Sequence, residues 1–415
     1  MQHEVTTLRK SGHLDQAYKL AKEMLEKQDS SFGTKNAFSW VIYELIKREG
    51  ELVKANKKSE LATHQNLEKW LREYSRMFDH AEPNIVHSNT LRVTLKLSKK
   101  WSGFLAFAKW FGTERLSEED HNGFKTDNGK TTMSIAEQFY NRVGSHLSEF
   151  HSRYQDEVIQ WAQGTLDLGI ERFSNSQFLP YDKAKWLLTQ GAVEEAETMM
   201  IRLVKRIPKV AWTWASLACV YRERDTSKAI LFFTYATQLA RKEDEVAKVR
   251  IYLAELLANA GRYDEAAHQT ILAKSYREKN SYRIPPLLAS LLQTDWFAKV
   301  DHEKAQRVRY GDEIATQALA LVGLDANAVI PKFSKPSATF NDADVTLISG
   351  KLIQHEGNNF GFVKSGNGQS AFVPGDLIAK GSLKHGESCN FKVIPSVDKQ
   401  GRPSLKAVAL VTEPV

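Results

Sequence analysis

The sequence predicts a mainly α-helical chain that ends in a small five-stranded β-barrel, and three observations support this fold class. Over residues 1–325, apolar side chains recur at three- and four-residue spacing, which is the period of amphipathic helices. Within residues 178–280, one pattern of glycine, alanine and large aromatic residues repeats. After residue 343, apolar side chains alternate at every second position instead, as they do in strands.

The repeated pattern is that of a helical hairpin. Gly191 precedes Ala196 at the same spacing at which Gly261 precedes Ala266. Glycine allows the chain to reverse, and a small alanine lets two antiparallel helices approach closely. Trp214 is one of the large residues that we expect to fill the space between successive hairpins.

This pattern resembles the tetratricopeptide repeat (TPR), which has a period of about 34 residues. The resemblance implies a TPR-like α-solenoid, with repeats over residues 171–325 and an irregular, TPR-like helical domain over residues 1–170. The first helix of each hairpin would line a concave surface that binds a protein partner or a second protomer. The partner-binding candidates in this register are Tyr181, Lys185, Trp212, Arg222 and Lys248.

Composition restricts the function classes. The net charge of +7 is compatible with an acidic partner such as nucleic acid. The two cysteines, Cys219 and Cys389, are too few for a disulfide framework or a zinc cage, which indicates a reduced, cytoplasmic protein. Residues 1–21 lack the apolar core of a signal peptide, and the most apolar stretches, such as residues 104–111, are too short to span a membrane. No phosphate-binding glycine loop, metalloprotease motif or nucleophile elbow occurs, so we expect no enzyme, no cofactor and no metal site.

A change in composition and in hydrophobic period marks the C-terminal domain. Proline, serine and asparagine gather over residues 326–343, which predicts a linker. Residues 344–415 then contain five segments with the two-residue period of strands: 346–355, 360–364, 370–373, 388–394 and 405–411. Five short strands favour a closed barrel, because closure removes exposed sheet edges.

Three phenylalanines on neighbouring strands form the most informative constellation. Alternation places Phe360 and Phe362 on one face, and Phe372 joins them if the next strand directs its small and branched residues into the core. Aromatic rings on the outer face of a barrel can stack on unpaired bases. Basic residues that could meet phosphates near this face are Lys351, Lys364 and Arg402, together with Lys392 and Lys406.

The segment Phe360-Gly361-Phe362-Val363, followed by Phe372-Val373, resembles the paired RNA-binding motifs of cold-shock domains. The flanking residues 350–355 and 383–386 are similar to the cold-shock-like barrels of the ribonuclease II family. The resemblance implies an OB-type barrel that binds single-stranded RNA or DNA, with the three phenylalanines stacked on bases and His355 beside them. Ile353-Gln354-His355 stands where cold-shock proteins carry tryptophan and a second aromatic, so the platform is smaller than theirs.

A second resemblance concerns the helical region. The block at residues 104–111, the loop at 124–127 and the segment at 134–137 look similar to helical proteins of bacterial conflict, or anti-phage, gene clusters. We take the polar stretch that joins these segments, residues 113–131, as a surface loop.

These features lead to three hypotheses of different classes. The first is a non-enzymatic adaptor that binds single-stranded RNA or DNA on the barrel and a protein partner on the repeats. The second is a pure protein–protein scaffold whose barrel is only a docking module; one form of this hypothesis is a component of a bacterial anti-phage, or conflict, system. The third is an enzyme or effector of a bacterial defence cluster whose active site no sequence motif reveals. Exposure of the phenylalanine face separates the first two hypotheses.

Overall fold

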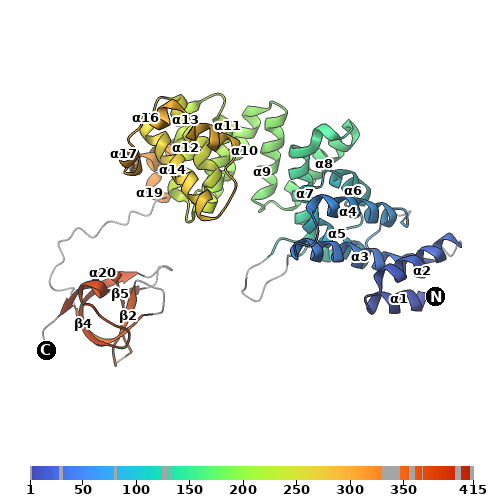
Figure 1. Ribbon diagram of the computed structural model, residues 1–415, viewed down its shortest axis with the longest axis horizontal. Coiled ribbons are helices and arrows are strands. Elements are labelled where there is room, and N and C mark those ends of the chain that lie inside the picture. Colours follow the sequence, from blue (N-terminus) through green and yellow to red (C-terminus); the bar gives the residue numbers. More distant parts are fainter. Residues whose placement is uncertain are drawn as a thin grey trace. The chain divides into compact units, whose positions relative to one another are not determined.

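The computed structural model describes residues 2–27, 31–78, 82–123, 129, 132–329, 346–354, 360–366, 368–397 and 403–411. Contacts within the chain divide it into two units, Met1–Val329 and Ile330–Val415. The first unit is helical and the second contains the strands (Figure 1). His355 and Arg402, and residues 330–343 of the predicted linker, lie outside the described residues.

The helical unit follows the predicted helical period from end to end. Its helices are α1 (Gln2–Lys10), α2 (Leu14–Glu26), α3 (Phe32–Lys54), α4 (Glu60–Ser75), α5 (Ile85–Leu97), α6 (Phe104–Phe111), α7 (Ile135–Phe150), α8 (Asp156–Arg172), α9 (Phe178–Thr189), α10 (Val193–Arg206), α11 (Ala211–Tyr221), α12 (Thr226–Leu239), α13 (Ala247–Asn259), α14 (Tyr263–Lys279), α15 (Pro286–Leu292), α16 (Asp295–Lys299), α17 (His302–Gln306), α18 (Glu313–Leu321) and α19 (Ala326–Val329). Short 3₁₀ turns lie at η1 (Glu119–His121), η2 (His151–Arg153) and η3 (Glu243–Glu245). Within the described residues, every helix is too short or too polar to cross a bilayer.

Successive helices pack as hairpins, as the repeat pattern predicted. α9 packs on α10, α11 on α12 and α13 on α14, and each hairpin also contacts the next (Figure 1). The small residues of the repeat, Ala196, Ala218, Ala254 and Ala266, are fully buried. Trp214 is fully buried too and donates its indole N–H to the carbonyl of Pro208 at 2.8 Å. The TPR-like α-solenoid is therefore confirmed.

The glycine turns share one hydrogen-bonding pattern. Gly191 and Gly261 both adopt a φ of +74° at the end of a helix, a conformation that costs glycine little. The next amide in each case bonds back to a carbonyl five residues earlier, Ala192 to Leu187 at 3.0 Å and Arg262 to Leu257 at 2.9 Å. These are Schellman bonds, which satisfy carbonyls that the helix end leaves free. The glycine-to-alanine spacing seen in the sequence thus marks the end of one helix and the beginning of the next.

The C-terminal unit is a closed barrel with strand order β1-β2-β3-β5-β4. Its strands are β1 (Thr346–Ile353), β2 (Gly361–Lys364), β3 (Ser370–Val373), β4 (Ser388–Val397) and β5 (Pro403–Val411), and a short helix, α20 (Gly375–Lys380), follows β3. β3 and β5 pair in parallel and close the barrel, while the other pairs are antiparallel. The predicted five-stranded barrel is therefore confirmed, and α20 is an element that the periodicity did not predict.

One glycine in β1 permits closure. β1 pairs with β4 over its first part and with β2 over its last part, and Gly350 lies just before the first β1–β2 pair, Lys351 with Lys364. A Cβ atom on Gly350 would stand 2.1 Å from the carbonyl oxygen of Lys364. Because that neighbour is backbone, it cannot move aside without breaking the strand pairing.

We therefore expect Gly350→Ala to destabilise the barrel by about 1–3 kcal/mol, the usual cost of overpacking. The helical unit gives an internal control, since all nine tryptophans of the chain precede residue 330. Calorimetry should show the barrel transition at lower temperature, while the unfolding transition seen by tryptophan fluorescence stays in place. An unchanged barrel transition would contradict the role assigned to Gly350.

A buried carboxylate lies inside the helical unit. Asp182 on α9 is 3% exposed, and its Oδ2 has no hydrogen-bond partner within the described residues. Burial raises the pKa of Asp182 from 3.8 to about 7; Lys185 and Arg142 oppose the rise, and Glu149 adds to it. The folded state therefore favours the protonated acid, and folding becomes more costly as the pH rises from about 4 to 7.

Asp182→Asn should remove this pH-dependent cost. The variant should gain about 2–4 kcal/mol of unfolding free energy relative to the wild type at pH 8, and the gain should shrink steadily toward pH 4. Urea unfolding at several pH values measures the difference. Asp167→Asn is the matched control, because Asp167 is exposed on α8 and pairs with Lys183 at 2.8 Å. A pH-independent difference for Asp182→Asn would refute the assignment.

Candidate nucleic-acid interface

The three phenylalanines lie together on the outside of the barrel. Phe362 on β2 is directly opposite Phe372 on β3, with ring centroids 5.8 Å apart. Phe360, immediately before β2, lies 5.6 Å from Phe372 and 6.3 Å from Phe362. The planes of Phe362 and the other two rings are strongly inclined, at 70° to Phe372 and 82° to Phe360. The three residues form one cluster, which we call the phenylalanine face.

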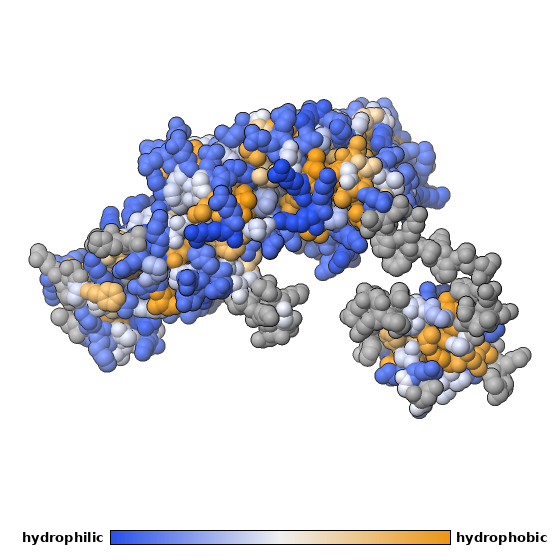
Figure 2. All heavy atoms as spheres, turned by 180° about the vertical axis from the view of Figure 1, so that it is seen from behind, coloured by the Kyte–Doolittle hydropathy of each residue, from blue (hydrophilic) through white to orange (hydrophobic). Residues whose placement is uncertain are grey.

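The opposite side chains of the same strands explain this exposure. Val363, Ala371 and Val373 are buried in the barrel core together with Phe391 of β4. Because successive side chains in a strand point to opposite sides, Phe362 and Phe372 must point outward. Phe362 is 39% exposed, and Phe360 and Phe372 are half-buried against their neighbours. Figure 2 shows apolar residues gathered on the visible face of the barrel, bordered by more hydrophilic ones.

Three lysines surround the phenylalanine face. Lys364 follows Phe362 by two positions on β2 and is directly opposite Lys351 on β1, and Lys406 on β5 is opposite Phe372. All three are exposed, and within the described residues none forms an ion pair. Two like charges opposite each other in a sheet repel. A polyanion along this edge would relieve that repulsion.

The other predicted contacts divide into two groups. Lys392 is exposed but lies on β4, which adjoins neither β2 nor β3, so it is away from the phenylalanine face. His355 and Arg402 lie outside the described residues, and their predicted roles stay predictions. Ile353, which pairs with Phe362 across the β1–β2 ladder, extends the apolar surface; in the sequence it was named only as a departure from the cold-shock pattern and not as a contact residue. The two-residue alternation of the predicted strand 346–355 is the sequence signal that could have placed Ile353 on the outer face.

The predicted partner residues of the repeats form two clusters. In the first, Trp212 of α11 stacks on Phe178 of α9 at 5.7 Å and 13° and meets Tyr181 edge-on at 5.3 Å. Lys185 lies over the Tyr181 ring at 5.7 Å and pairs with Glu149 at 3.5 Å. Burial raises the pKa of the Tyr181 hydroxyl above its ordinary value. This cluster joins the first helices of two hairpins.

The second cluster joins α11 to α13. Arg222 pairs with Glu255 at 2.5 Å and lies over the ring of Tyr252 at 4.6 Å. Lys248 also approaches that ring, at 5.3 Å, and is exposed. The structure therefore places Tyr181 and Lys185 on α9, Trp212 on α11, Arg222 just after the end of α11, and Lys248 on α13. Within the described residues, no cluster of histidine, cysteine and acidic side chains could hold a metal ion.

Comparison with protein families gives two partial matches. Residues 346–410 match the model described as S1/CSD-like domain 2 of the TOTE conflict systems. Residues 177–318 match DUF7017, a domain of unknown function. The two matches do not cover residues 104–137, where the sequence suggested a likeness to conflict-system proteins. No curated protein matches the chain.

Solved structures give low similarity over most of the chain. A monomeric mutant of IFIT1 with Gppp-AAAA is 12% identical, with a TM-score of 0.33 and coverage of 77% of both chains. Yeast Tom70 is also 12% identical with a TM-score of 0.33, and the match covers 73% of this chain and 61% of Tom70. From the family match and its own geometry, the C-terminal unit is similar to the S1/CSD-like domains of TOTE conflict systems, in agreement with the cold-shock-like barrel predicted from the sequence.

Proposed function

We propose that the protein is a non-enzymatic adaptor that binds single-stranded RNA, or single-stranded DNA, on the barrel and a protein partner on the helical repeats. The observation that carries the proposal is the phenylalanine face with its three lysines, which form no ion pair with any residue that the structure describes. The match of this barrel to an S1/CSD-like domain supports nucleic acid as the ligand. The same match supports a role within a conflict system.

The geometry favours unpaired bases over a duplex. The three rings lie within 6.3 Å of one another, so adjacent bases of a splayed strand could each contact one ring. Bases inside a duplex are already stacked and cannot offer their faces to side chains. Lys351, Lys364 and Lys406 stand at the margin, where the backbone of such a strand would run.

The repeats supply the second half of the proposal. The aromatic cluster around Trp212 and the cationic cluster around Arg222 follow the first helices of successive hairpins, which in helical solenoids form the partner surface. Phe178 is exposed and stacks on the half-buried Trp212, and a partly exposed aromatic pair of this kind is a typical anchor for a protein partner. The sequence contains no catalytic motif that would make either surface an active site.

Removing a ring should weaken binding of a short oligo-U by the full-length protein. Phe362→Ala and Phe372→Ala should each cost about 1–3 kcal/mol, because each loses one stacked base. Fluorescence anisotropy at low salt measures the affinity, and oligo-dT in a parallel titration separates RNA from DNA. Phe32→Ala is the matched control, since Phe32 is 72% exposed on the helical unit.

Two results would contradict the nucleic-acid proposal. One is a dissociation constant of the wild-type protein above about 100 μM at low salt. Proteins that bind nucleic acid without sequence specificity already reach this affinity, so a weaker value would mean no real binding. The other is an equal loss of affinity in Phe32→Ala and Phe362→Ala. Loss of protein partners without loss of RNA in the phenylalanine variants would favour the scaffold hypothesis instead.

The lysines should determine the salt dependence. Three phosphate contacts predict that log K falls with log salt at a slope of about −2, and Lys364→Gln should reduce the slope by about 0.7. Lys392→Gln should leave the slope unchanged, because β4 is not adjacent to the phenylalanine-bearing strands. The same titration repeated between low and moderate salt gives all three slopes. If Lys364→Gln and Lys392→Gln change the slope equally, the lysines beside the phenylalanine face do not form the proposed phosphate contacts.

A further inference from the structure

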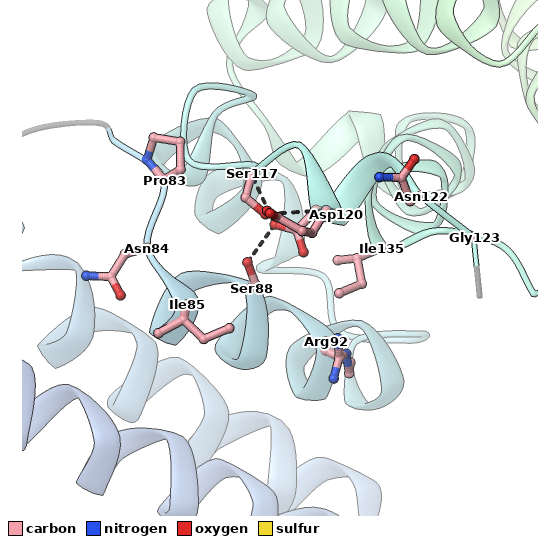
Figure 3. A pocket seen from close by; sticks show the side chains of 11 residues that line it. Pro83, Asn84, Ile85, Ser88, Arg92, Ser117, Asp120, Asn122, Gly123 and Ile135 are labelled. Carbon is pink, nitrogen blue, oxygen red and sulfur yellow. Dashed lines mark hydrogen bonds between the residues drawn. The ribbon is translucent and has the colours of Figure 1, made fainter.

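A cavity in the helical unit has no role in the proposed function. It holds about 460 Å³ and lies between α5, the η1 segment and the start of α7 (Figure 3). Ile85 and Ser88 line it from α5, Asp120 from η1 and Ile135 from α7. The volume is in the range of small-molecule sites, and the lining combines the apolar side chains of Pro83, Ile85 and Ile135 with polar and charged ones.

The polar floor of this cavity is one buried carboxylate. Asp120 is only 3% exposed, and its Oδ2 accepts hydrogen bonds from the Ser88 hydroxyl at 2.6 Å and the Ser117 amide at 3.0 Å (Figure 3). Its other oxygen, Oδ1, makes no hydrogen bond within the described residues. The carboxylate is thus fixed in orientation and keeps a free acceptor.

The charge of Asp120 lacks a counter-charge in the described part of the chain. Both of its donors are neutral, and among the residues that the structure describes no lysine, arginine or histidine forms an ion pair with Asp120. At the rim, Arg92 and Glu119 are both exposed and carry opposite charges, so they add no net charge. A buried carboxylate without a cation is costly, and a cation that donates hydrogen bonds to it regains that cost.

The apolar walls define the rest of the ligand. Ile85 is 66% exposed at the cavity, an unusual position for a large aliphatic side chain, while Ile135 is buried on the opposite helix. A short aliphatic stem would cover Ile85 on its way to Asp120. We propose that this cavity binds a cationic nitrogen group, an ammonium or guanidinium, carried on an apolar stem, with the head group on Asp120 Oδ1.

n-Butylguanidinium and its neutral isostere n-butylurea test the proposal on the full-length protein. The guanidinium should bind at least about tenfold more tightly by calorimetry, since only a charged donor recovers the strength of a charge-assisted hydrogen bond. Equal affinity for the two probes, or no binding of the guanidinium up to about 10 mM, would overturn the proposal.

Variants locate the head group and the stem separately. Asp120→Asn should weaken n-butylguanidinium about tenfold or more, whereas Glu118→Gln, which removes an exposed charge outside the cavity, should not. Should Asp120→Asn fail to fold, Ile85→Ser serves, because that exposed side chain supports no core. Ile85→Ser should weaken n-butylguanidinium but leave methylguanidinium unchanged; an equal effect on both, or on neither, would overturn the assigned orientation.

The source of the cationic group is decided by a third probe. A blocked peptide with one central arginine presents the same head group on a protein backbone. Tighter binding of this peptide than of n-butylguanidinium assigns the cavity to an arginine side chain of a protein partner. Weaker binding of the peptide assigns it to a free small molecule, and both results support the cationic ligand.

Discussion

The alternation of side chains in β2 and β3 is the constraint on which the functional account depends. A barrel of this size has one interior, and Val363, Ala371 and Val373 occupy it. Their burial leaves Phe362 and Phe372 no position except the outer face. A shift of one residue in register would bury the rings and expose the valines. Core packing therefore determines which side chains form the proposed nucleic-acid surface.

The two proposed surfaces differ in how their charges are compensated. On the repeats, Arg222 and Lys185 are paired with glutamates and stacked on tyrosines. Paired cations attract a polyanion weakly, which is consistent with the proposal that this surface takes a protein partner and not nucleic acid. Lys351 and Lys364 on the barrel face each other without an acid among the described residues. Unpaired cations of this kind are the ones that release counterions when they meet phosphates.

Periodicity predicted much of this structure because the determining signals are local. The change from a helical to a two-residue period located all five strands, and the spacing from Gly191 to Ala196 located a hairpin whose turn the structure shows. The helix α20 was missed, since six residues are too few to display a helical period. The cavity at Asp120 could not be predicted, because its walls come from segments far apart in the sequence that only tertiary packing brings together. The parallel pairing of β3 with β5 is non-local for the same reason.

Photo-crosslinking is the most direct test of the central claim that the outward rings hold unpaired bases. Full-length protein irradiated with a short oligo-U and digested would be analysed by mass spectrometry for peptides that carry a nucleotide. The account predicts crosslinked nucleotides on the peptides that contain Phe362 and Phe372. Crosslinks confined to peptides from the helical unit, with the β2 and β3 peptides unmodified, would contradict it.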